Sequence, residues 1–130
     1  MSSLISNISF KESSGDYNCF KKKYSLQQRE REFALIRSKY PTKIPTIVEP
    51  SNSKAPKINR NKFLLQTDLT VGQFIYMIRS RINLSPEESL FFFVNGKIPI
   101  MGALISDIYQ TDRDEDGFLY FSYSRENVFG

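Results

Sequence analysis

The stretch that decides the fold is residues 62–82, KFLLQTDLTVGQFIYMIRSRI. Its first five residues, KFLLQ, predict a short apolar strand over 62–66. Thr70 and Gln73 then form a T-x-x-Q capping box, in which each side chain accepts a hydrogen bond from the other residue's backbone N–H. Apolar residues follow on one side of a helix that we expect to end near Asn83. These residues are Val71, Phe74, Ile75, Ile78 and Ile82.

Upstream of this stretch, the sequence predicts a strand and a helical segment. Residues 43–49, KIPTIVE, are rich in β-branched side chains, although Pro45 argues against a fully paired position in a sheet. The polar segment 50–61 would join this strand to KFLLQ as a long hairpin-like loop. Before it, apolar residues recur at helical spacing over 16–39, and Pro41 ends that pattern.

Downstream, the pattern predicts a strand, a hairpin turn, a short helix, an acidic turn and a last strand. The strand covers 90–94, Asn95-Gly96 form the turn, and Pro99 ends the strand that returns from it. The short helix covers 103–109, the acidic turn 111–117 and the last strand 118–124. A long helix on one face of a mixed sheet is the β-grasp arrangement of ubiquitin. We therefore expect an α+β fold, a ubiquitin-like β-grasp with a mixed four-stranded sheet, preceded by extra helices.

The chain divides into four parts on this reading. They are a flexible N-terminal extension (1–15), an N-terminal helical subdomain (16–40), a ubiquitin-like core (41–124) and a flexible C-terminal tail (125–130).

Composition excludes most enzyme chemistry. The chain of 130 residues has no His and a single Cys, Cys19, so it lacks His bases, Cys–His metal sites and an internal disulfide. Its N-terminus has no basic start and no long apolar stretch, and is not a secretory signal. We expect a soluble, cytoplasmic protein with no catalytic residue, no metal and no cofactor.

Charge is divided unevenly, because residues 1–62 carry 13 basic and 5 acidic side chains, and residues 63–130 carry 5 and 9. A basic face suits a nucleic acid, a lipid headgroup or an acidic peptide, and the alternative is a solvated surface with no partner. Nucleic acid is not expected, because only three consecutive lysines, 21–23, support it.

Asp112, Asp114 and Asp116 resemble the start of a calcium loop, but Tyr123 stands where that loop needs a carboxylate, so an acidic solvated turn is favoured.

Two features suggest binding and modification. In KFLLQ, Phe63 and Leu65 point one way and Leu64 the other. If this strand lies at a sheet edge, its backbone can pair with an extended peptide; the alternative is that all three side chains only face core. The last residue, Gly130, has no Cβ to hinder an enzyme at its carboxylate.

Four segments carry a family resemblance: IRSKYPTKIPTIVE (36–49), the stretch 62–82, SLFFFVNGKIP (89–99) and DGFLYFSYSRENVFG (116–130). Over about residues 30–130 the sequence resembles the autophagy ubiquitin-like modifiers, the GABARAP, light-chain-3 and autophagy-related protein 8 group. The resemblance implies a ubiquitin fold with two extra N-terminal helices.

The resemblance also implies a function. Gly130 would be activated by an E1-like enzyme, passed to an E2-like enzyme and joined to phosphatidylethanolamine, with a cysteine protease for deconjugation. The chain would then be a substrate rather than a catalyst, cytoplasmic before lipidation and on the autophagosome membrane after it. The alternative is a non-conjugated peptide-binding adaptor in vesicle trafficking or microtubule association.

The family binds receptor and adaptor peptides of the aromatic-x-x-aliphatic type by strand addition, which implies three sets of residues here. The aromatic pocket would be formed by Glu32, Ile36, Pro45, Ile47, Lys62, Leu64 and Phe118. The aliphatic pocket would be formed by Phe63, Leu65, Leu69, Phe74 and Met77. Acidic residues beside the peptide motif would meet Lys43, Arg60, Lys62 and Arg81.

Three departures from the family pattern stand out. Gln66 replaces a common Pro, Gly117 replaces a commonly bulky residue, and the extension of about 15 residues is long enough to cover or regulate the pockets.

Overall fold

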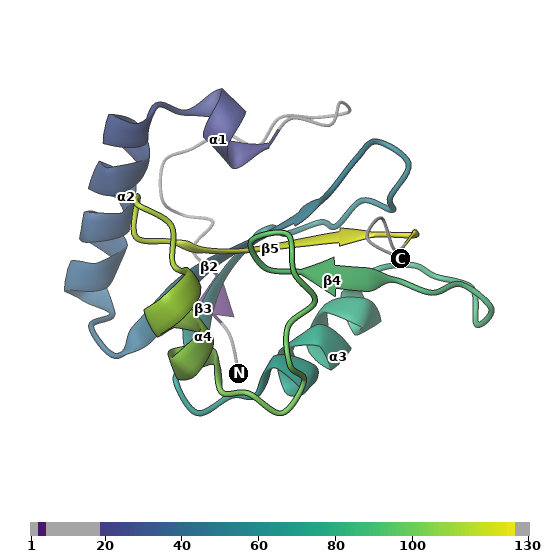
Figure 1. Ribbon diagram of the computed structural model, residues 1–130. Coiled ribbons are helices and arrows are strands. Elements are labelled where there is room, and N and C mark those ends of the chain that lie inside the picture. Colours follow the sequence, from purple (N-terminus) through teal and green to yellow (C-terminus); the bar gives the residue numbers. More distant parts are fainter. Residues whose placement is uncertain (1–2, 5–18, 127–130) are drawn as a thin grey trace.

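The computed structural model describes residues 3–4 and 19–126 (Figure 1). Five strands and four helices are seen in these residues. In chain order they are β1 (Ser3–Leu4), α1 (Phe20–Lys23), α2 (Leu26–Lys39), β2 (Lys43–Pro50), β3 (Lys62–Gln66), α3 (Val71–Arg81), β4 (Phe91–Phe93), α4 (Ile105–Asp112) and β5 (Leu119–Ser124). No helix among these residues is long and apolar enough to cross a membrane.

The strands form one mixed sheet in the order β1-β3-β2-β5-β4. The central pair, β2 and β5, is parallel, and all other pairs are antiparallel. The strands β3-β2-β5-β4 are the mixed four-stranded sheet that the sequence predicts, so the ubiquitin-like fold class is confirmed. The short strand β1, at the outer edge of β3, was not predicted.

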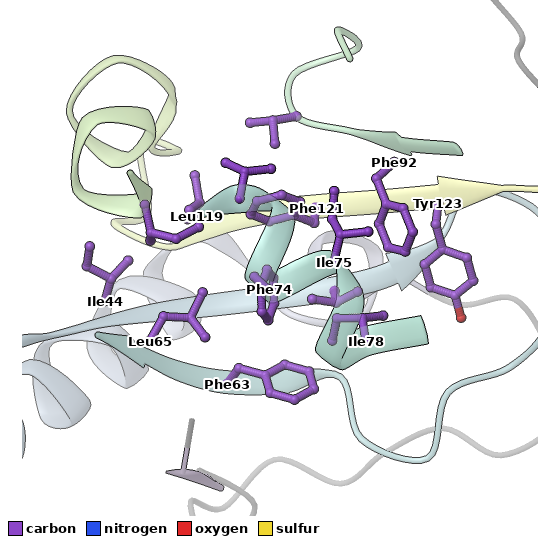
Figure 2. Close-up of a cluster of buried hydrophobic side chains, with 14 of the residues drawn as sticks. Ile44, Phe63, Leu65, Phe74, Ile75, Ile78, Phe92, Leu119, Phe121 and Tyr123 are labelled. Atoms are coloured by element: carbon purple, nitrogen blue, oxygen red, sulfur yellow. The ribbon is translucent and has the colours of Figure 1, made fainter. Parts of the chain in front are cut away.

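One face of the sheet carries the larger core. In Figure 1, α3 and α4 lie below the sheet and α1 lies above it. Side chains alternate along each strand, so Phe63, Leu65 and Phe121 enter the cluster that packs against α3. Figure 2 shows the Phe74 side chain of α3 between those of Phe63 and Phe121, with its ring centroid 5.6 Å from that of Phe63 and 5.1 Å from that of Phe121. Both pairs have the edge-to-face geometry that aromatic rings prefer.

The predicted capping box of α3 is confirmed. The backbone N–H of Gln73 donates to the Thr70 hydroxyl at 3.1 Å, and the N–H of Thr70 donates to the Gln73 side chain at 2.9 Å. The helix ends at Arg81, slightly before the predicted end. A second capping box joins Ser25 and Gln28 and begins α2. The helical pattern over 16–39 did not predict the break between α1 and α2, although Ser25-x-x-Gln28 is the same kind of signature.

Two local expectations were wrong. Pro45 argued against a central strand, yet β2 is central in the sheet. Pro45 itself pairs on one side only, because the ladder between β2 and β5 begins at Thr46. The turn at Asn95 and Gly96 has the expected positive φ angles, 51° and 75°, but the strand predicted after it is reduced to the single bridge Val94–Lys97.

Candidate peptide-binding site

The backbone of β3 bonds to β2 through alternate residues. The N–H of Val48 donates to the carbonyl of Asn61 at 2.8 Å, just before β3 begins. Hydrogen-bonded pairs recur at every second residue of an antiparallel ladder, so Phe63 and Leu65 bond to β2. Leu64 therefore directs its N–H and C=O toward the other edge. Pro45 stands opposite Leu64, where no N–H is needed.

The outer edge of β3 is not open along its whole length. Ser3 pairs with Leu64 and Leu4 pairs with Phe63, so β1 covers two of the five residues of β3. The idea of KFLLQ as a free edge strand therefore needs correction: in this structure β3 lies between β2 and a strand of the chain's own extension.

The structure brings most of the predicted aromatic-pocket residues together. Ile36, Ile47, Leu64 and Phe118 belong to one cluster, and each is fully buried. Pro45 is also buried, on the strand that carries Ile47.

The same cluster contains Phe20, which sequence reasoning missed. Its ring centroid lies 5.5 Å from that of Phe118 in an edge-to-face arrangement. Its backbone N–H donates to the Glu49 carboxylate at 2.6 Å. The available signal was one large apolar residue at the start of a short basic helix, FKKK. Phe20 therefore ties α1 to the sheet within the cluster of predicted pocket residues.

Two buried charges lie at this cluster, Glu32 and Lys62. Burial raises the pKa of Glu32, and the positive charges of Lys62 and Lys39 partly oppose that rise. The Lys62 ammonium lies 5.7 Å from the centroid of the Phe20 ring. A positive charge is thus held next to the aromatic cluster, where it favours an anionic neighbour.

The predicted aliphatic set lies on the opposite face of the sheet. Phe63, Leu65 and Phe74 are buried in the larger core, and Leu69 and Met77 are half-buried at its margin. Of this set, therefore, Leu69 and Met77 are the members with a substantial surface for a ligand to touch.

The predicted basic contacts differ in exposure. Arg81 is exposed, and its guanidinium carbon lies 5.9 Å from the centroid of the Phe63 ring. Lys43 and Arg60 are half-buried and Lys62 is buried. Three of the four cations can therefore be reached from solvent.

The acidic turn is part of the scaffold rather than a solvated loop. The side chain of Asp116 is fully buried. Its carboxylate accepts hydrogen bonds from Arg29 of α2 at 2.6 Å, from the Tyr120 hydroxyl at 2.5 Å and from the N–H of Phe118 at 2.8 Å. Burial and the neighbouring Asp116 charge raise the pKa of the Tyr120 hydroxyl. This buried network fixes α2 against the residues that carry Phe118 into the cluster.

The neighbouring Asp114 forms the outer part of that network. It pairs with Lys21 of α1 and lies 3.6 Å from the Arg29 guanidinium. Burial alone would raise the pKa of Asp114, but the hydrogen bond from Lys21 and the nearby positive charges hold it below its ordinary value. Among residues 3–4 and 19–126, no three Cys, Asp or Glu side chains are grouped to hold a metal ion.

Gly117 explains one departure from the family pattern. Its φ is +100°, and a Cβ added there would lie 2.5 Å from Cδ2 of Phe33. A bulky residue therefore does not fit in this conformation. The predicted conjugation residue, Gly130, lies outside the described residues.

Comparisons with known proteins agree with this architecture. The model of the family described as "Autophagy protein Atg8 ubiquitin like" matches residues 28–130. Autophagy-related protein 8d of Arabidopsis thaliana is 53% identical over 112 residues, which are 85% of this chain and 93% of the relative. Autophagy-related protein 8 of Mycosarcoma maydis is 49% identical over 114 residues, covering 87% of this chain and 97% of the relative.

Solved structures show the same fold. Plasmodium falciparum Atg8, in complex with a Plasmodium falciparum Atg3 peptide, superimposes with a TM-score of 0.77 at 37% identity, covering 84% of this chain and 97% of that one. Trypanosoma brucei ATG8 gives a TM-score of 0.73 at 37% identity, with 88% and 95% covered.

Proposed function

This chain belongs to the Atg8 family of autophagy ubiquitin-like modifiers, and we propose that Gly130 is its point of attachment to phosphatidylethanolamine. The observation that carries the proposal is the match of the family model up to and including residue 130. The geometry agrees with it, because β5 is a central strand and ends at Ser124, six residues before Gly130. Lipid attachment would hold the domain at a membrane.

Conjugation needs partners, because Gly130 is the group that reacts and not a catalyst. An E1-like enzyme would activate its carboxylate and an E2-like enzyme would transfer it. The similarity to Plasmodium Atg8 in complex with an Atg3 peptide supports a peptide-binding partner. A cysteine protease would release the lipid, and the chain would move between the cytoplasm and the autophagosome membrane.

We assign receptor binding to the outer edge of β3. The backbone groups of Leu64 face this edge, and apolar side chains of β3 enter clusters on both faces of the sheet. An aromatic-x-x-aliphatic peptide added as a strand would direct its aliphatic side chain toward Leu69 and Met77 on one face. It would direct its aromatic side chain toward the aromatic cluster on the other face, whose buried members would have to move apart to admit it. Acidic residues of the peptide would meet Lys43, Arg60 and Arg81. Micromolar affinity is the expected range for such a short ligand, about −8 kcal/mol.

Lipidation is tested in a reconstituted reaction with the E1-like and E2-like enzymes, ATP and vesicles containing phosphatidylethanolamine. The intact chain should gain the mass of the lipid less one water, because an amide forms, and Gly130→Ala should not. The matched control Gly102→Ala should react normally, because nothing lies within 4 Å of a Cβ at that position. Efficient lipidation of Gly130→Ala would refute the assignment.

Peptide binding is tested separately by calorimetry. The probe is a seven-residue peptide of three acidic residues followed by Trp-Ala-Ala-Leu. Arg81→Glu should weaken binding about tenfold, whereas the control Lys97→Glu, an exposed cation on the turn after β4, should have little effect. Equal weakening by both variants would mean that charge acts only at long range. Binding without lipidation would favour the alternative function, a non-conjugated adaptor.

A further inference from the structure

The strand β1 occupies the edge to which receptor peptides are proposed to bind. Ser3 stands opposite Leu64 and Leu4 opposite Phe63, in an antiparallel pair. Lys62, Leu64 and Gln66 are the residues of β3 whose N–H and C=O face away from β2, and β1 pairs with the middle one, Leu64. A peptide that extends the sheet would need these same backbone groups, so β1 and the peptide cannot both pair with Leu64.

We propose that the N-terminal extension is an autoinhibitory strand, which caps β3 and must leave before a receptor peptide binds. This inference rests on the proposed peptide-binding function and adds its regulation. It explains why a ubiquitin-like core, complete in β3-β2-β5-β4, has a fifth strand at the edge that would bind ligand.

The pairing is suited to displacement because it is short. β1 pairs with β3 over two residues, whereas β2 pairs with β3 over five. Each backbone hydrogen bond contributes only a modest net stabilisation, so two residues cannot hold the edge permanently. Residues 5–18 join β1 covalently to α1, so a displaced β1 remains in the same molecule and can pair with β3 again.

Charge gives acidic peptides an advantage over β1. Residues 1–10, MSSLISNISF, contain no charged side chain. They cannot form the ion pairs that an acidic peptide would make with Lys43, Arg60 and Arg81. The extension would therefore exclude weak, uncharged ligands more effectively than acidic ones, and so raise the selectivity of the edge.

The first experiment measures the affinity of the acidic Trp-Ala-Ala-Leu peptide by calorimetry. The variants are the full chain, a chain that lacks residues 1–15, Ser3→Pro and the control Ser13→Pro. Proline at position 3 removes the N–H that faces Leu64, whereas position 13 lies outside β1. A peptide binds only the uncapped fraction, so uncapping should tighten binding about threefold to tenfold in the deletion and in Ser3→Pro. Ser13→Pro should match the full chain.

The second experiment measures amide hydrogen exchange at Leu64 without any peptide. The Leu64 amide should exchange slowly in the full chain and in Ser13→Pro, and about threefold to tenfold faster in the deletion and in Ser3→Pro, because the same uncapped fraction limits both exchange and peptide binding. The Phe63 amide, which bonds to β2, is the internal control for intact folding.

The two readouts separate the proposals. Equal affinity in all four proteins would overturn autoinhibition while leaving the peptide site in place. No peptide binding in any protein would overturn the proposed peptide site. In that case a Leu64 amide that is protected only when β1 is intact would still support the cap, and an unprotected amide in the full chain would overturn it.

Discussion

Replacing Gly117 with alanine should destabilise the fold more than any comparable change at an exposed turn. A residue with a Cβ is unfavourable by about 1–2 kcal/mol even in the ordinary left-handed region, and the φ of Gly117, +100°, lies beyond that region. The new Cβ would also lie 2.5 Å from Cδ2 of Phe33. Overpacking of this kind costs about 1–3 kcal/mol. We therefore expect the free energy of unfolding to fall by about 2–5 kcal/mol.

Urea titration followed by circular dichroism measures this loss. The matched control is Gly102→Ala, because Gly102 has no neighbour within 4 Å of an added Cβ, and its free energy of unfolding should change by less than about 0.5 kcal/mol. Adding Phe33→Leu to Gly117→Ala should recover the steric part of the loss and leave the backbone part. If Gly117→Ala were no less stable than Gly102→Ala, the account of this turn would be wrong.

Three further changes test the scaffold by urea titration. Asp116→Asn removes the carboxylate that lies 2.6 Å from the buried Arg29 guanidinium and leaves only the more distant Asp114, at 3.6 Å. It should lower the free energy of unfolding by about 3 kcal/mol, whereas Asp112→Asn, at a more exposed pair, should change it by less than about 1 kcal/mol. Asp114→Asn should lower the free energy of unfolding by its full amount above pH 3.8, and this difference from the native chain should vanish as the pH falls through the lowered pKa of Asp114. A difference that does not depend on pH would exclude an ionic origin. Phe20→Ala should lower the free energy of unfolding by about 3 kcal/mol or more, and the same truncation at exposed Leu35 by less than about 1; similar losses would show that Phe20 is not a core residue.

Local signals allowed much of the fold to be predicted. The bounds of KFLLQ as a strand agree with β3, and the capping box at Thr70 and Gln73 begins α3. These features depend on residues within a few positions of one another, so the spacing of residue types is enough to predict the strand and the start of the helix. The alternation of Leu119, Phe121 and Tyr123 likewise placed all three in the larger core.

Long-range contacts could not be predicted in this way. Arg29 and Asp116 are 87 positions apart, and the sequence pattern gave no reason to pair them. A strand of two residues such as β1 has no periodicity to detect. Family resemblance named Ile36 and Leu64 as pocket residues, and the structure brings them together, but resemblance did not reveal that Phe20 packs among them or that β1 caps the edge.

The parallel pairing of β2 with β5 has a mechanical consequence. A membrane anchor at Gly130 would pull along β5, while a receptor held at β3 would pull on the other side of β2. Tension between cargo and membrane would then act along the strands and load the hydrogen bonds of the β2–β5 ladder in shear. These bonds would have to break together rather than one after another, so unfolding the domain should require a higher force than opening a hairpin from its end.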